Sequence, residues 1–397
     1  MKALSFLGTG NYQPTTYTWN GASCRTRFMP VALRDLFAPE ELKVAVTPGA
    51  TDKHGDDLAE ACDYTPVAVP GASGEAAWWK MFNALTDAVE PGERLLVDVT
   101  HGYRSQPFLA LAVILYLRAV KDVTIERIVY GAFESGTDEE SPVVDLTAFL
   151  TLIDWARATR QFQDYGDADA LKDMFVDMAD ETRLGDQVAL NLRPAGQTLK
   201  KASRALALNR PIETLHTAAG FVGEMEAAMD DAMSIPQARP VKRLMLQIAE
   251  RFSPIGHAEG SVFTSRGFTA QAAMLRLYLD TEQYLQAFTL GQEMLVSWVC
   301  IQNDLDPRSR GVKADEDQEP KGRAGARSML HHWTDNEETW AGEPITDLEA
   351  TVTRLWTRLR TKRNDVAHAG FSYNPMPAAD LIEEADELLA EVAAFFE

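Results

Sequence analysis

Short apolar runs and longer amphipathic stretches alternate over the first 150 residues of the chain. The short runs are rich in β-branched residues and predict strands at residues 2–8, 43–47, 66–69, 94–99 and 126–133. Helical patterns separate them, as at residues 74–89 and 106–120. Continuous apolar strands that alternate with helices are typical of a parallel sheet covered on both faces. We therefore expect an N-terminal α/β domain of the Rossmann-like, doubly wound type.

From about residue 146 the strand signal disappears, and amphipathic helical patterns continue to the end of the chain. The chain then divides into an α/β domain at 1–148, a helical connecting region at 149–269 and a second helical domain at 270–397. Within the last domain, residues 305–328 are poor in large apolar side chains and predict a solvated, mobile loop. The expected fold class is thus α/β followed by an all-α region.

Composition narrows the class of protein. With 397 residues, 46% of them hydrophobic, the chain can form two or three globular domains. Cys24, Cys62 and Cys300 lie far apart and form no CxxC pair, which favours a reducing cytoplasm and no metal cluster. The N-terminal apolar stretch is too short for a signal peptide, and the apolar run at 107–117 is about half a membrane span. We expect a cytoplasmic protein with no membrane contact.

One segment departs from the acidic character of the chain, whose net charge is −21. Such a charge disfavours coating nucleic acid with the whole surface, because phosphate would be repelled. Residues 351–370 nevertheless contain a single acid, Asp365. Their basic residues are Arg354, Arg358, Arg360, Lys362 and Arg363. One interpretation is a solvated helix face whose terminal His368 complements the helix dipole; the other is a local site for a nucleic-acid backbone.

Arg363 and His368 form an RxxxxH pattern with Asn364 between them. On a straight helix five steps of about 100° leave the arginine and the histidine about 140° apart, on different faces. They can act together only if the helix loosens near Gly370, or if a second copy of the chain supplies its own pair across a twofold axis.

The chemistry of these three side chains suits RNA cleavage without a metal. Histidine can move protons near neutral pH, and arginine can hold the scissile phosphate and stabilise the charge that develops on it. Asn364 can orient the phosphate or the histidine. The RNA itself supplies the nucleophile, its 2′-OH. The upstream basic residues, Arg354, Arg358, Arg360 and Lys362, would then form a groove for the RNA backbone.

Two polar loops follow predicted strands of the α/β domain, GTGNY at 8–12 and DVTHGYR at 98–104. Ligands of doubly wound sheets bind beyond the carboxyl ends of the strands, so both loops should lie at the binding edge. Glycines admit a ligand to the backbone, tyrosines stack on bases, and histidine and arginine pair with phosphate. The candidate ligand-binding residues are Gly8, Thr9, Gly10, Asn11, Tyr12, Asp98, Thr100, His101, Gly102, Tyr103 and Arg104. The alternative is that the glycines serve only tight turns.

The sequence lacks the motifs of several other classes of enzyme, namely Rossmann dinucleotide-binding enzymes, P-loop NTPases and serine hydrolases. GTG is not GxGxxG, because Gln13 occupies the place of the third glycine, and there is no GxxxxGK[ST] of an NTPase. No GxSxG elbow supports a Ser/His/Asp triad. His331 and His332 are adjacent and have no partner at a metal-ligand spacing, so they are taken as surface or structural residues, and no metal site is expected.

The motifs at the two ends resemble those of CRISPR-associated proteins. MKALSFLGTGNY at 1–12 and DVTHGYRSQP at 98–107 closely resemble the ligand-binding domain of these proteins, the CARF domain. RNDVAH at 363–368 resembles the RxxxxH signature of HEPN ribonucleases, which lies near the end of a helical domain. The order CARF then HEPN is similar to the accessory ribonucleases of type III CRISPR systems. Residues 150–270 carry no such resemblance.

The resemblance implies an endoribonuclease that a cyclic oligoadenylate activates and that cleaves single-stranded RNA without a cofactor in antiviral defence. Two CARF domains would form a twofold pocket for the ring, and two HEPN domains would dimerise and build one composite site from Arg363, Asn364 and His368 of each copy. Some relatives also degrade their activator in the CARF pocket. Thr9, Thr100 and His101 would be the candidates for that activity here.

Two other functions stay open. In one, the chain is a non-catalytic sensor or scaffold in which HEPN serves only for dimerisation. In the other, it is a ligand-regulated transcription factor, although the acidic C-terminal residues 379–397 show no helix-turn-helix pattern.

Overall fold

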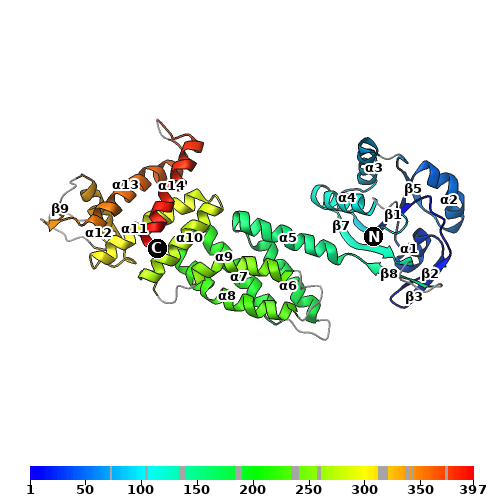
Figure 1. Ribbon diagram of the computed structural model, residues 1–397, viewed down its shortest axis with the longest axis horizontal. Coiled ribbons are helices and arrows are strands. Elements are labelled where there is room, and N and C mark those ends of the chain that lie inside the picture. The colour runs from blue at the N-terminus through cyan, green and yellow to red at the C-terminus, as the bar shows by residue number, and fades with distance from the viewer. Residues whose placement is uncertain are drawn as a thin grey trace. The chain divides into compact units, whose positions relative to one another are not determined.

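The computed structural model describes most of the chain and divides it into two compact units, Met1–Thr151 and Leu152–Glu397 (Figure 1). The described residues are 1–71, 74–102, 106–133, 140–183, 190–233, 241–256, 261–311, 321–335, 339–340, 343–371 and 374–397. The first unit is α/β and the second is helical, which confirms the expected fold class. Among these residues, no helix combines the length and the apolar character that a membrane span requires.

The first unit is built on an eight-stranded sheet in the order β3-β2-β8-β7-β6-β1-β4-β5. The strands are β1 (Lys2–Leu7), β2 (Thr15–Trp19), β3 (Ala22–Thr26), β4 (Leu42–Val46), β5 (Thr65–Ala68), β6 (Arg94–Asp98), β7 (Thr124–Gly131) and β8 (Glu140–Asp145). The five strands predicted from the sequence are β1, β4, β5, β6 and β7, and neighbours among them pair in parallel. Because β4 lies on one side of β1 and β6 on the other, the direction of winding reverses at β1.

The sequence interpretation missed three strands, β2, β3 and β8. β2 and β3 form an antiparallel hairpin in which Trp19 faces Ala22 across a two-residue loop. Asn20 and Gly21 occupy that loop with φ of 47° and 83°, the left-handed backbone that Asn-Gly favours in hairpin turns. β8 runs antiparallel to β7 and parallel to β2, so the sheet is mixed at this side. Asn-Gly directly after the Thr-rich run TTYTW was the signal that could have predicted the hairpin.

Helices cover both faces of the sheet. They are α1 (Met29–Phe37), α2 (Pro48–Ala61), α3 (Glu75–Asp87) and α4 (Gln106–Val120). α1 and α2 share a core with Ala3 and Leu7 of β1. Leu4 and Phe6 point to the opposite face and are also buried, and α3 and α4 contact the strands β5 and β7 (Figure 1). Burial on both faces explains the continuous apolar runs of the parallel strands.

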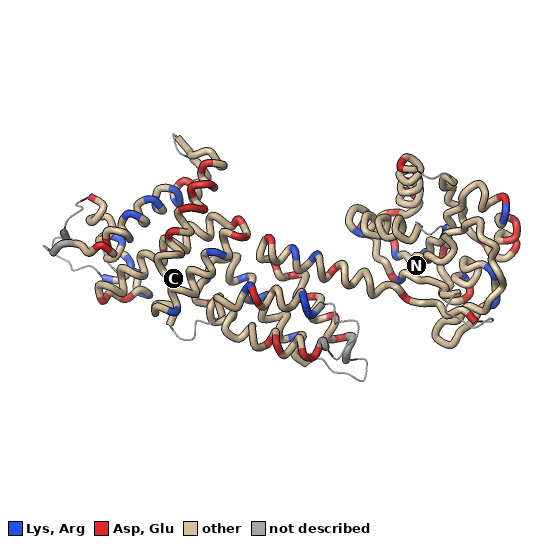
Figure 2. Tube along the Cα trace, viewed as in Figure 1, with Lys and Arg blue, Asp and Glu red and all other residues tan. Residues whose placement is uncertain are grey.

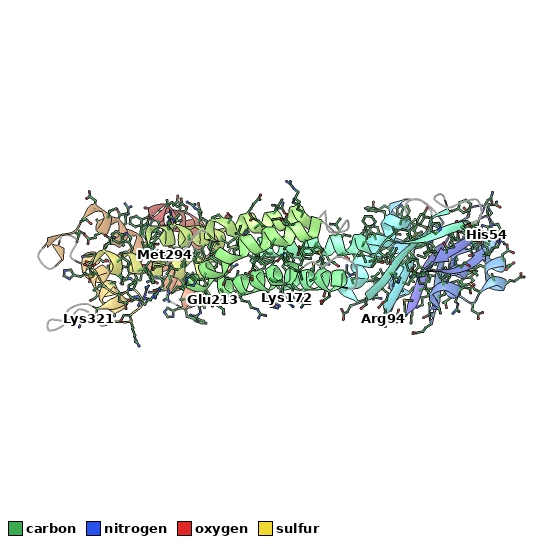
Figure 3. The ribbon with its side chains drawn as sticks, turned by 90° about the horizontal axis from the view of Figure 1, so that it is seen from below. His54, Arg94, Lys172, Glu213, Met294 and Lys321 are labelled. Atoms are coloured by element: carbon green, nitrogen blue, oxygen red, sulfur yellow. The ribbon has the colours of Figure 1, made fainter. Side chains whose placement is uncertain are left out.

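The second unit consists of helices around one continuous core. They are α5 (Ala148–Tyr165), which begins before the division between the units, α6 (Asp169–Arg183), α7 (Leu192–Ala207), α8 (Pro211–Met233), α9 (Val241–Gly256), α10 (Ser265–Asp280), α11 (Tyr284–Gln302), α12 (Gly322–Asp335), α13 (Asp347–Ala367) and α14 (Ala378–Phe396). A small hairpin, β9 (Thr339–Trp340) and β10 (Glu343–Pro344), lies between α12 and α13. The core extends from Trp155 to Phe396 and includes Met294, labelled in Figure 3. The division expected at 269/270 therefore does not interrupt the core.

The prediction of a mobile loop at 305–328 is wrong for the C-terminal end of that range, because α12 begins at Gly322. Ala326, Met329, Leu330 and Trp333 repeat at helical spacing and are buried. Arg323 donates to the hydroxyl of Ser297 at 2.9 Å and pairs with a carboxylate of α11, which anchors the first turn of this helix. Residues 312–320 of the expected loop lie outside the described residues.

Candidate functional site

The loops that follow β1 and β6 meet at the carboxyl edge of the sheet, where the winding reverses. A Cβ at Gly8 would lie 2.8 Å from the carbonyl oxygen of His101, so only glycine allows the two loops to approach so closely. A Cβ at Gly102 would lie 2.6 Å from Oε1 of Gln106, in the first turn of α4. Open α/β sheets bind ligands at this position, so both predicted loops lie together at the site that the topology favours.

Asp98 at the end of β6 is fully buried and holds this edge together. Its carboxylate accepts from the hydroxyl of Ser5 at 2.5 Å and from the backbone N–H of Thr100 at 2.9 Å, and also from the Thr100 hydroxyl. The Thr100 oxygen in turn accepts from the N–H of Gly131 at 2.8 Å. Burial raises the pKa of Asp98 to about 6. Asp98 and Thr100 thus join β1, β6 and β7 and fix the start of the loop after β6.

His101 is buried, and its state differs from the cation that the sequence interpretation paired with phosphate. The backbone N–H of Met29, the first residue of α1, donates to Nε2 of His101 at 3.0 Å. An acceptor nitrogen cannot carry a proton, and burial lowers the pKa of His101 to about 4. The imidazole is therefore neutral near pH 7 and fixes the start of α1 to the loop after β6.

Tyr12 folds back on its own loop. The N–H of Gly8 donates to the Tyr12 hydroxyl at 2.9 Å, and this hydroxyl donates to the carbonyl of His101 at 3.2 Å. The Tyr12 ring lies 4.1 Å from the His101 ring and 5.0 Å from that of His54, centroid to centroid. The Tyr12 hydroxyl thus occupies the Gly8 N–H, and the Tyr12 ring packs against both imidazoles.

Two residues of α2 complete the edge and were missed from the sequence. The Lys53 ammonium donates to the carbonyl of Thr9 at 2.8 Å and to Oδ1 of Asn11 at 2.6 Å, and it is exposed. His54, labelled in Figure 3, is buried; its Nε2 donates to the carbonyl of Gly10 at 2.8 Å. Its Nδ1 is buried without a hydrogen-bond partner among the described residues. α2 follows β4, a parallel neighbour of β1, so the same edge rule applied to β4 would have found both residues.

The cation expected from the second loop cannot be placed. Tyr103 and Arg104 lie outside the described residues. Lys53 is thus a cation that the structure brings to this edge from an element that the sequence motifs did not include.

The C-terminal motif lies at the end of α13. Thr346 and Glu349 form a capping box at the start of this helix, and Val352, Leu355, Trp356 and Leu359 bury one face. The helix continues through Ala367 and ends on His368, after which Ala369 and Gly370 have φ of 53° and 69°. The expected loosening therefore comes only after the motif, and within one chain Arg363 and His368 stay on different faces.

A cavity of about 310 Å³ lies beside the end of α13. One wall consists of α13 residues that include Asn364 and His368, both exposed. The lining also contains Thr361, Lys362, Asp365, Phe371, Asn374, Met376 and Leu381, and it does not contain Arg363. Arg363 donates to Oδ1 of Asn364 at 3.3 Å, and its Nε is buried without a partner among the described residues. The structure thus brings Asn364 and His368 together and leaves Arg363 outside the cavity.

Three of the four basic residues expected to bind RNA pair with acidic side chains of α14. Arg354 and Arg358 bind Glu391 at 3.1 and 2.6 Å, and Lys362, only 8% exposed, pairs with Glu384. Figure 2 shows basic positions on α13 and acidic positions on the neighbouring α14. These three basic residues are thus ion-paired within the chain, because the helix adjacent to α13 is acidic, and their role in binding RNA stays a prediction.

Arg360, the fourth basic residue, contacts α12 and a tryptophan of its own helix rather than α14. Its guanidinium donates to Nδ1 of His331 at 2.8 Å and lies 5.0 Å from the centroid of the Trp356 ring. The His331 ring packs edge-on against the same tryptophan at 4.7 Å. His331 thus contacts the helix that carries the motif. In the described part of the chain, no group of three or more His, Cys, Asp or Glu side chains is arranged to hold a metal ion.

A curated protein and a solved structure are among the known proteins that this chain resembles. No family model matches the chain. CRISPR-associated protein MJ1674 of Methanocaldococcus jannaschii is 28% identical over 101 residues, which are 25% of this chain and span only 16% of that protein's length. Csm6 of Enterococcus italicus, bound to cyclic hexa-2′-fluoro-hexa-dAMP, matches over 100% of this chain and 94% of that chain at 11% identity and a TM-score of 0.44. That structural likeness is too weak to decide function. The chain is thus similar over those 101 residues to a CRISPR-associated protein, which agrees with the resemblance of the motifs.

Proposed function

We propose that this chain is a cyclic-oligoadenylate-activated endoribonuclease of type III CRISPR defence that cleaves single-stranded RNA without a metal. The observation that carries the proposal is the cavity at the end of α13, in which Asn364 and the exposed His368 lie together. A histidine at a helix C-terminus, open to solvent and beside an amide, is suited to move a proton at a bound phosphodiester.

The composite site would form between two copies of the chain. Arg363 lies outside the cavity of its own His368, so a single chain offers the base without the cation. A twofold contact between two α13 helices would bring the motif of one copy to that of the other, because isologous contacts place the same segment against itself. Arg363 of either copy would then stabilise charge on the scissile phosphate, while the 2′-OH of the RNA attacks.

The activator would bind at the carboxyl edge of the sheet in the first unit. The N–H groups of Gly8 and Gly102, and the Lys53 ammonium, are donors suited to the phosphates of a cyclic oligoadenylate. The Gly8 N–H is held by the Tyr12 hydroxyl in the ligand-free chain, so the ring would have to replace that bond. Activation requires that the ligand bind the active arrangement more tightly than the resting one.

The deciding experiment is an RNA cleavage assay on purified protein with a panel of cyclic oligoadenylates and with EDTA. His368→Ala and Arg363→Ala should each lower the rate by about 10²–10⁴-fold while ligand binding stays intact. Leu348→Ala, exposed on the first turn of the same helix, is the matched control. Protein that binds a ring tightly and never cleaves RNA would instead support the non-catalytic sensor.

A further inference from the structure

The cavity beside His368 has walls of two chemical kinds. Phe371, Met376 and Leu381 provide apolar surface, whereas Asp365 and Asn374 provide polar groups. Its volume of about 310 Å³ is at the small end of sites for organic ligands. An aromatic side chain beside aliphatic ones, with a few polar groups, suits one planar ring system.

Among the residues that line the cavity, Phe371 is unusual because it is a large apolar residue that is 91% exposed. Its backbone N–H donates to the carbonyl of His368 at 3.0 Å, so its position is tied to that of the histidine. Proteins that bind single-stranded RNA stack unpaired bases on aromatic side chains of this kind.

The Asp365 carboxylate disfavours a phosphate in direct contact with it, on its own side of the cavity. The Lys362 ammonium pairs with Glu384. Oδ2 of Asp365 accepts from the N–H of Met376 at 3.3 Å, and the carboxylate retains further lone pairs for a ligand. A neutral ligand with N–H donors fits these groups, whereas an anion would be repelled by the carboxylate.

We propose that this cavity binds the base of the RNA nucleotide next to the scissile phosphate and prefers guanine to uracil. Guanine offers two adjacent donors, N1–H and N2–H, to a carboxylate, whereas uracil offers one N–H between two carbonyl oxygens. Phe371 would stack on the base and Asp365 would read its edge. This inference rests on the proposed ribonuclease function and adds its sequence preference.

The test compares short RNAs that differ only in the nucleotide at the cleavage site. Wild-type protein should cleave the guanine substrate roughly ten- to a hundredfold faster than the uracil substrate, as a bidentate contact allows. Asp365→Asn should reduce that ratio to a few-fold, because an amide presents both a donor and an acceptor; its oxygen can still accept from Met376. Phe371→Leu should slow cleavage of all four substrates and keep their order. Leu348→Ala should change neither quantity.

A binding measurement separates failure of the inference from failure of the proposed function. His368→Ala protein is mixed with labelled RNAs that carry a 2′-deoxy nucleotide at the cleavage site, and binding is followed by fluorescence anisotropy. A guanine preference that Asp365→Asn removes supports the base site even if no RNA is ever cleaved. Cleavage with equal rates for guanine and uracil, or with a ratio that Asp365→Asn leaves unchanged, overturns it. A Phe371→Leu protein that no longer dimerises would show that a second copy fills the cavity, which also overturns the inference.

Discussion

Replacing His101 by glutamine should change how the stability of the first unit depends on pH. The pKa of His101 is lowered from 6.5 to about 4. Between pH 4 and pH 6.5 the imidazole is therefore protonated in the unfolded chain and neutral in the folded unit. Its stability contribution is complete above pH 6.5 and is lost as pH falls toward 4. The Asp98 pKa is raised from 3.8 to about 6, so the folded unit takes up a proton that the unfolded chain does not, and stability rises as pH falls through 6.

The two effects oppose each other in the same pH range. On going from neutral pH to pH 5, the titration of His101 lowers the free energy of unfolding by about 2 kcal/mol, and that of Asp98 raises it by about 1 kcal/mol. Relative to wild type, His101→Gln should therefore gain about 2 kcal/mol of unfolding free energy between pH 7 and pH 5, and Asp98→Asn should lose about 1 kcal/mol. Glutamine can still accept from the N–H of Met29 but does not titrate. Other carboxylates titrate in all three proteins and cancel in these differences.

The assay is urea unfolding at several pH values, with hydrogen exchange of the β1 and β6 amides read by mass spectrometry so that the first unit is followed by itself. The double variant should show the sum of the two differences if the sites act independently. If the difference between His101→Gln and wild type stays constant from pH 5 to pH 7, His101 is not a buried neutral acceptor, and its assignment as a positioning residue fails.

Three further predictions concern the proposed reaction, the activator site and the paired helices. If the 2′-OH is the nucleophile, products should carry 2′,3′-cyclic phosphates and 5′-hydroxyls, and mass spectrometry that finds 5′-phosphates would exclude this mechanism. Lys53→Ala should raise the activator concentration for half-maximal cleavage several-fold with little change in the maximal rate, because charge-assisted bonds to phosphate are lost; the exposed Lys80→Ala is the control, and equal dose–response curves would place the phosphates elsewhere. Glu384→Gln should destabilise the helical unit by roughly 1–3 kcal/mol, since the buried Lys362 ammonium loses its charged partner. Glu391→Gln should cost less than about 1 kcal/mol, because its arginines are more exposed; urea unfolding that reverses this order would contradict the pairing.

The sequence by itself determined the order of the two units and where the ligand loops lie. Runs of apolar residues in β1, β4, β5, β6 and β7 identify strands that are buried on both faces, and the carboxyl ends of parallel strands share one edge. The loops at 8–12 and 98–102 therefore had to meet, which the contact of Gly8 with His101 bears out. Local pattern is sufficient for such statements because periodicity reports burial and the direction of a parallel sheet fixes the edge.

Only the tertiary structure decided which side chains are free to act. The basic residues of α13 are visible in the sequence, but their partners Glu384 and Glu391 lie on another helix, so the sequence shows a charge and not whether it is neutralised. In the same way His101 looks like a phosphate ligand until Met29, far from it in the chain, is found to donate to its ring. Burial and hydrogen bonding set the protonation of a side chain, and both depend on residues that folding, rather than sequence, brings close.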